Sequence, residues 1–199
     1  MAIDGKIGST SYTEERARAN GHDPVILAGA VKAAQGELPV GLVLTRDANG
    51  DFIPYEEVAN EVIGTGTGTA TAFSGTLTKK PVEPGSVSVT DGVEAFSDDG
   101  FGTLTGAAGG TGTVNYGTGA ISVTFNAAPA NTVEVKADYV TAIDGILDEK
   151  VDTAKTASAT YIPHGSVRRD ALKVGAATPA DPDATLLKRL TAKGIYPMG

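Results

Sequence analysis

The chain has 199 residues, of which 41% are hydrophobic, and it carries a formal net charge of -8. Proteins that wrap nucleic acid need clustered Lys and Arg to release counterions from phosphates, so this acidic balance argues against DNA or RNA as a partner. The absence of cysteine excludes a disulfide framework and a thiolate metal site.

Residues 1–22 are the first expected element, an N-terminal arm rich in Gly, Ser and Thr. They contain no apolar segment typical of a secretory signal and no run long enough to cross a membrane. Ser11 and Glu14 have the spacing of a capping box, so a short helix through Ala19 is an alternative to an extended arm. We expect synthesis in the cytoplasm, and no membrane partner.

Two charged stretches flank the middle of the chain, residues 24–58 and 140–175. The first favours two or three strands, with Asn49-Gly50-Asp51 as a hairpin turn between VGLVL and FIPY. The second stretch has a similar pattern, with Gly145-Ile146-Leu147 and YIPHGSV. Neither stretch alone is able to close a core, so we predict one discontinuous domain made of residues 23–62 and 141–199.

Residues 63–140 differ in composition, because they hold more than half of the 26 Gly and few of the 16 basic residues. Their apolar residues alternate in AISVTF and TVEVKADY, the period of half-buried strands. Turn residues separate the runs at Asp91-Gly92, at Asp99-Gly100 and at Gly117-Thr118-Gly119. We predict an inserted immunoglobulin-like β-sandwich of roughly six short strands.

The sequence near the C-terminus predicts a helix more clearly than any other part of the chain. Asp181 is placed to cap it, with Pro182 at its first position, and Gly194 to end it after Lys193. Leu186, Leu187 and Leu190 would form its buried stripe, and Ile195 would return against Leu190.

The glycine run VIGTGTGTATAFSGTL, residues 62–77, lacks the third glycine of a dinucleotide fingerprint and the Gly-Lys-Ser/Thr end of a P-loop. We interpret it as a flexible crossing between two folding units. His22 and His164 belong to no HExxH or GxSxG motif and are interpreted as loop histidines, although a site formed in space stays open. Ser97-Asp98-Asp99-Gly100 is interpreted as a polar hairpin turn, since it lacks the spacing of an EF-hand.

The two flanking stretches, taken as one domain, resemble the head decoration (capsid cement) proteins of lambda-like tailed bacteriophages. The likeness rests on the order of elements: a Ser/Thr-rich arm through Tyr12, the strand pair LPVGLVLTRDANGDFIPY, the segment AIDGILDEKVDTAKTASATYIPHGSVRRDAL and a terminal helix ending LLKRLTAKGI. The inserted stretch resembles a small β-domain of phage structural proteins, through PGSVSVTDG, DDGFGTLTG and VNYGTGAISVTF in that order. Decoration proteins usually have no such insertion.

The resemblance implies a mainly β protein with a β-clip-like core and a C-terminal helix, interrupted by the immunoglobulin-like sandwich. It also implies a homotrimer on the outer surface of the expanded capsid, at local threefold positions, with the major capsid protein as partner. No catalytic residue, metal or cofactor is expected. The residues expected to bind the capsid are those of the arm: Ile7, Ser9, Thr10, Ser11, Tyr12 and Thr13.

Two alternatives remain open. A tail, fibre or baseplate module would use the inserted sandwich to attach to a host glycan or surface protein. A hydrolase would need titratable groups that converge in a pocket, and the sequence offers only carboxylates scattered over turns.

Overall fold

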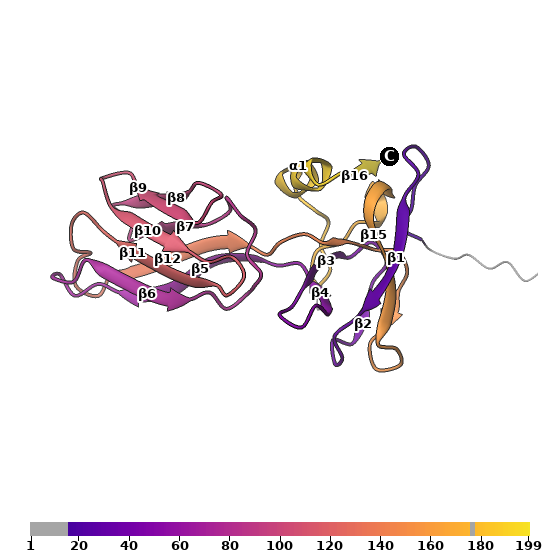
Figure 1. Ribbon diagram of the computed structural model, residues 1–199, viewed down its shortest axis with the longest axis horizontal. Coiled ribbons are helices and arrows are strands. Elements are labelled where there is room, and N and C mark those ends of the chain that lie inside the picture. Colours follow the sequence, from indigo (N-terminus) through magenta and orange to yellow (C-terminus); the bar gives the residue numbers. More distant parts are fainter. Residues whose placement is uncertain (1–15, 176–177) are drawn as a thin grey trace, which may run out of the picture.

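The computed structural model describes residues 16–175 and 178–199, and these form a mainly β protein, as expected from the sequence. Two units built on separate sheets lie end to end along the long axis of the molecule (Figure 1). We call residues 16–56 together with 141–199 the core unit, and residues 57–140 the inserted unit. The expected arm residues lie outside the described part of the chain, namely Ile7, Ser9, Thr10, Ser11, Tyr12 and Thr13, as do Ser11 and Glu14 of the capping-box alternative.

The core unit contains eight strands: β1 (Val25–Ala30), β2 (Glu37–Leu38), β3 (Val43–Arg46), β4 (Phe52–Pro54), β13 (Gly145–Leu147), β14 (Val151–Asp152), β15 (Ser158–Arg168) and β16 (Ile195–Met198). Six of them form one sheet in the order β1-β15-β13-β3-β4, with β16 parallel to β15, and β2 pairs with β14. Val31, just after β1, bridges to Phe52 in β4, and the Lys32 N–H donates to the Phe52 carbonyl at 3.1 Å. The sheet is therefore close to a closed barrel.

The central strands of this sheet are buried on both faces. In β3, Val43 packs in one apolar cluster and Leu44 in another, and Ile146 and Leu147 of β13 are divided in the same way. Strands covered on both faces are typically continuous apolar runs, which is how these segments look in the sequence. The predicted hairpin at Asn49-Gly50-Asp51 is confirmed between β3 and β4, with Gly50 at φ +86°.

Helix α1 (Ala184–Ala192) covers one of these clusters through its buried residues Leu186 and Leu190. The expected cap at Asp181 is wrong: Asp183 caps the helix, since its side chain accepts from Leu186 N–H at 2.7 Å. Asp181 instead pairs with Lys173 at 2.6 Å. The expected end is confirmed, with Gly194 at φ +80° and Ile195 in the same cluster as Leu190.

A short 3-10 helix follows β15 at Arg169–Ala171. Across the described residues, no helix is long and apolar enough to cross a membrane.

The inserted unit contains eight further strands: β5 (Glu57–Thr65), β6 (Ala72–Thr76), β7 (Ser88–Thr90), β8 (Ala95–Asp98), β9 (Thr103–Gly106), β10 (Thr111–Val114), β11 (Ala120–Thr124) and β12 (Glu134–Val140). They form one hydrogen-bonded sheet in the order β5-β12-β7-β8-β9-β10-β11-β6. The expected number of about six is too low, because β5 lies mostly before the expected boundary at residue 63 and because β8 and β9 are strands of only four residues each. The predicted turns at Asp91-Gly92, Asp99-Gly100 and Gly117-Thr118-Gly119 are confirmed.

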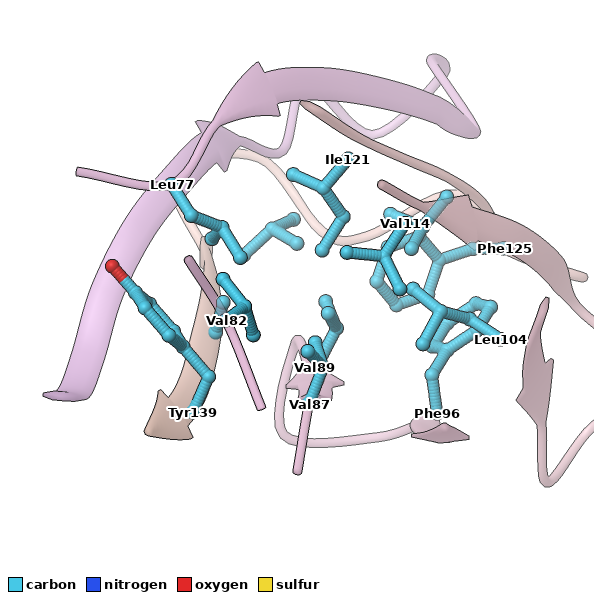
Figure 2. Packing of buried hydrophobic residues seen from close by; sticks show 13 residues of the cluster. Leu77, Val82, Val87, Val89, Phe96, Leu104, Val114, Ile121, Phe125 and Tyr139 are labelled. Carbon is cyan, nitrogen blue, oxygen red and sulfur yellow. The ribbon is translucent and has the colours of Figure 1, made fainter. Parts of the chain in front are cut away.

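The inserted sheet curls around its own core. Figure 2 shows side chains from opposite parts of the sheet meeting in its interior, among them Leu77, Phe96, Phe125 and Tyr139. The Phe96 and Phe125 rings are edge to face, with centroids 4.9 Å apart. Burial of apolar area contributes about 25 cal/mol per Å² removed from water, so this cluster is a main source of the inserted unit's stability.

The inserted unit starts earlier in the chain than residue 63, the expected boundary. β5 pairs with β12 from Glu57, opposite Val140, to Thr65, opposite Glu134. The glycine-rich composition begins only inside β5. The first six residues of this strand, EVANEV, are rich in charge and resemble the flanking stretch, although they already pair with β12. The units meet instead at Glu56 and Thr141, where Glu56 N–H donates to Thr141 Oγ1 at 2.9 Å and Thr141 N–H donates to the Glu56 carbonyl at 3.0 Å.

The glycine run is therefore not a crossing between units, which corrects the interpretation from the sequence. Gly64 lies within β5, and a Cβ there would be 2.6 Å from the Phe73 ring. A Cβ at Gly66 would collide with the carbonyl of Ala130. These glycines allow close packing at the end of the inserted unit that is remote from the core unit, and they do not provide flexibility between units.

Candidate binding surface

The N-terminal edge of the core unit carries the features that a binding surface needs. Strand β1 forms this edge, and over Val25–Ala30 it pairs, among the described residues, with β15 alone. Its sequence VILAGA contains no charge, and its side chains are exposed at Val25 (45%), Ile26 (37%) and Leu27 (47%). Successive residues of a strand point to opposite faces, so both faces of β1 are apolar and open to solvent.

Close packing fixes β1 in this position. Gly29 lies against the Phe52 ring, which a Cβ at position 29 would overlap. Gly165 in β15, at φ +114°, similarly leaves no room for a side chain beside Pro24. The register between the two strands shifts by a bulge between Val25 and Leu27, opposite Pro163, which has no N–H to donate. The exposed residues Val25, Ile26 and Leu27 therefore belong to a regular strand that is held in place by its packing, and not to a loop.

The segment before β1 continues the same edge along β15. Arg168 N–H donates to the Ala17 carbonyl at 2.7 Å, and Ala19 N–H donates to the Ser166 carbonyl at 3.0 Å. Ala17 is fully buried. The expected arm over residues 1–22 is therefore too long: its last part, from Arg16, belongs to the core unit, because these backbone groups complete the pairing of β15.

A buried carboxylate fastens this segment. Asp148 is fully buried, and its Oδ2 accepts from Arg18 Nη2 at 2.7 Å and from Arg16 Nη1 at 3.4 Å. Arg16 Nη1 also lies 2.9 Å from Glu149 Oε2. These contacts tie Arg16 and Arg18, at the start of the described chain, to the core unit.

Both histidines lie on this edge. His164 belongs to β15, so its interpretation as a loop residue is wrong, whereas His22 lies in the irregular segment before β1. Their Nε2 atoms are 3.0 Å apart, and Tyr196 of β16 lies beside both rings. The two residues are 142 positions apart in sequence, and no spacing rule connects them.

The inserted unit presents apolar side chains singly, at its turns. Val93 follows β7 and is 94% exposed, and Phe101 follows β8 and is 92% exposed. The two lie at opposite ends of β8, so they do not form one patch.

The acidic turn Ser97-Asp98-Asp99-Gly100 connects β8 and β9, which confirms its interpretation as a hairpin turn. The carboxylates of Asp98 and Asp99 accept hydrogen bonds from neighbouring groups of the inserted unit. Asp98 Oδ1 accepts from the Tyr116 hydroxyl at 2.6 Å, and its Oδ2 accepts from Gly85 N–H at 2.8 Å. Backbone N–H groups of Phe101 and Thr103 lower the pKa of Asp99. Burial and the hydrogen bond to Asp98 raise the pKa of Tyr116 to about 12.

Elsewhere in the part of the chain that the structure describes, titratable side chains meet in pairs such as Tyr139 with Glu61, whose oxygens are 2.6 Å apart. There, no three His, Asp or Glu side chains lie close enough to hold a metal ion together. One surface depression is lined by Arg168, Asp170, Lys173 and Asp181, among others, and these pair as Arg168 with Asp170 and Lys173 with Asp181. Comparisons with protein-family models, with curated proteins and with solved structures found no match.

Proposed function

We propose that the protein is a structural component of a phage particle, which binds the outside of the expanded capsid as a homotrimer at local threefold positions and stabilises it against internal DNA pressure. In this proposal the core unit is β-clip-like and the inserted unit is an immunoglobulin-like domain that projects from the shell. The observation that carries the proposal is the exposed, uncharged strand β1 at the base of the N-terminal segment. The order of elements in the sequence supports the capsid as the target.

A second copy of this chain is the occupant that fits β1. An exposed apolar edge strand without charge promotes association and is normally covered in a working protein. The chain has a formal net charge of -8, so copies repel one another over most of their surface. Residues 24–31 carry no charge, and there two copies approach without this repulsion.

The N-terminal residues then supply the contact with the shell. In the proposal, the expected arm from Ile7 to Thr13 adds a strand to an exposed edge of the major capsid protein, where main-chain hydrogen bonds provide affinity. A single arm loses conformational entropy on binding and binds weakly. Three arms on one trimer raise the apparent affinity by about 10² to 10⁴ through effective concentration. Within each chain, Arg16 and Arg18 hold the segment that follows the arm against Asp148.

Co-sedimentation with capsids of the phage that encodes the protein tests the proposal. We expect saturable binding to expanded shells, with three chains per local threefold site, and no binding to unexpanded shells. Absence of binding to both shells would overturn it.

A pair of matched variants tests the role of β1. Ile26→Lys places a charge on β1, whereas Val62→Lys places one on a 47% exposed apolar residue of β5 in the inserted unit. We expect Ile26→Lys to yield a folded monomer with weakened capsid binding, and Val62→Lys to remain a trimer, as measured by light scattering and sedimentation. A trimeric Ile26→Lys variant would contradict the assignment of β1.

A second function is favoured by one observation, the nearly full exposure of Phe101 and Val93 at the turns of the inserted unit. Exposed aromatic side chains bind sugar rings and protein surfaces. In this alternative the protein is a tail, fibre or baseplate module that attaches to a host glycan or surface protein. Binding of labelled protein to host cells, lost in Phe101→Ala together with Val93→Ser, would support it. Equal binding by the variant would exclude these turns.

A further inference from the structure

The histidine pair at the edge of the core unit has the geometry of a metal site. The Nε2 atoms of His22 and His164 face each other at 3.0 Å, with ring planes at 83°. Only two histidines occur in the chain, and the fold brings them together. His22 is exposed and His164 is half-buried, so an ion from solvent reaches both nitrogens.

The backbone around both rings is fixed before any ligand arrives. His22 N–H donates to Ser166 Oγ at 2.8 Å, and the His22 carbonyl accepts from Ser166 N–H at 2.9 Å. His164 is held within β15 opposite Val25. Behind its ring lies Gly194, where a Cβ would overlap Nδ1. A site that is already formed loses little entropy on binding.

The distance between the two nitrogens matches the requirement of late first-row cations. With metal–nitrogen bonds of about 2.0–2.1 Å, two imidazoles are about 3.3 Å apart at a tetrahedral angle and about 2.9 Å apart as neighbours in a square plane. The observed 3.0 Å lies between these values. Imidazole nitrogen is a ligand that suits Zn²⁺, Cu²⁺ and Ni²⁺.

The geometry points to a two-imidazole binding site for a divalent cation of this group, with His22 Nε2 and His164 Nε2 as ligands and water in the remaining positions. The proton now between the two Nε2 atoms moves to Nδ1 of its own ring, or to solvent if the pair is protonated, when the ion takes both lone pairs. Cu²⁺ binds most tightly, followed by Ni²⁺ and Zn²⁺, because nitrogen sites follow the Irving–Williams order. The Tyr196 ring lies beside both imidazoles, with ring centroids 5.5 Å from that of His22 and 6.0 Å from that of His164.

Titration calorimetry of the untagged full chain with Cu²⁺, Ni²⁺ and Zn²⁺ salts tests the site. We expect one ion per chain. His22→Ala and His164→Ala should each weaken binding by at least about tenfold, since even the outer-shell partners of metal ligands contribute about 10–100-fold. Tyr196→Phe is the matched control, because it changes the same cluster and keeps both nitrogens, and its affinity should equal that of the unmodified chain.

Electron paramagnetic resonance of the Cu²⁺ form gives a second, independent readout. Coupling to two imidazole nitrogens is expected in the unmodified chain, and coupling to one in His22→Ala, which alters an exposed residue outside the strands and leaves the fold intact. Coupling to one or no imidazole in the unmodified chain would overturn the proposal. An affinity that is unchanged in His22→Ala would overturn it as well, whatever the behaviour of His164→Ala.

Discussion

The core unit and the inserted unit each bury a carboxylate, and they satisfy it in different ways. In the inserted unit, Glu94 is 4% exposed and accepts from three backbone N–H groups, those of Gly110 at 2.8 Å, Asn126 at 2.9 Å and Ala108 at 3.2 Å. In the core unit, Asp148 accepts through Oδ2 from the arginines at positions 16 and 18, and its Oδ1 has no partner among the described residues. Glu94 is therefore held by backbone N–H groups of the loops around it, whereas Asp148 is paired with arginine side chains of the segment before β1.

The same contrast holds for apolar surface. The alternating strands of the inserted unit turn their apolar residues inward, and large exposed ones stand singly at Val62, Val93 and Phe101. The core unit exposes three neighbouring apolar residues on β1. Large exposed apolar residues are therefore scattered in the inserted unit and adjacent to one another on β1 of the core unit. Variants of the two units should therefore differ in how much stability they lose and in which unit loses it.

Replacing Glu94 by Ala should have the largest effect. Three backbone N–H groups would lose their acceptor in a buried site, which costs on the order of 3 kcal/mol of unfolding free energy. Urea unfolding, followed by the exchange protection of amides in the inserted unit, measures the loss. Glu94→Gln keeps one carbonyl acceptor and should lose about half as much; equal losses would show that the charge alone matters.

Replacing Asp148 by Asn should have an intermediate effect, confined to the core unit. The charge that attracts Arg16 and Arg18 disappears, and because the arginines are partly exposed we expect a loss of about 1–2 kcal/mol. Hydrogen exchange at Ala17 and Ala19 should accelerate, while amides of the inserted unit keep their protection. Slow exchange at both alanines in Asp148→Asn would mean that backbone pairing with β15 is sufficient to hold the segment.

Replacing Asp183, which caps α1, should cost more stability than replacing the nearby Asp181, which does not. Asp183→Ala should destabilise the core unit by about 1 kcal/mol, since it leaves Leu186 N–H without its acceptor. Asp181→Ala removes only an exposed pair with Lys173 and should cost less than about 0.5 kcal/mol. Thermal unfolding of the two variants checks the difference, and a larger loss for Asp181→Ala would reassign the cap.

The pH dependence contributed by Tyr116 should be the smallest effect and should appear only at high pH, in addition to the loss at every pH of the hydroxyl's hydrogen bonds with Asp98 and Gly102 in Tyr116→Phe. Its pKa is raised to about 12 by burial and by the hydrogen bond to Asp98, above the unfolded value of about 10. A raised pKa means that the folded state holds the proton more tightly, so the stabilisation is complete below pH 10 and is lost as the pH rises towards 12. Tyr116→Phe should flatten the decline in stability of the inserted unit over this range. A decline of equal slope in both proteins would assign the alkaline loss to other groups.

Local chemistry explains which parts of the fold could be predicted. The turns at Asn49-Gly50-Asp51 and at Asp99-Gly100 depend on residues that accept positive φ or accept hydrogen bonds from their own backbone. The end of α1 at Gly194 is of the same kind. The cap was misplaced by two positions because Asp181 and Asp183 both precede the helix, and only the path of the chain selects which one reaches Leu186 N–H.

The surface itself could be predicted only in part. The run VILAGA resembles any buried strand in sequence, and its exposure follows from its place at the edge of the sheet. The pairing of His22 with His164 depends on the register of β15 with the segment before β1, which no local pattern encodes.

By itself the sequence determined the mainly β class, the positions of the tight turns and the end of the helix, because each depends on the conformational preference of a few adjacent residues. Tertiary structure alone decided where the inserted unit begins, that the glycines near residue 65 serve close packing, and which apolar strand stays uncovered. These properties depend on contacts between residues far apart in the chain. Such contacts form, and contribute to stability, only when the whole unit has folded.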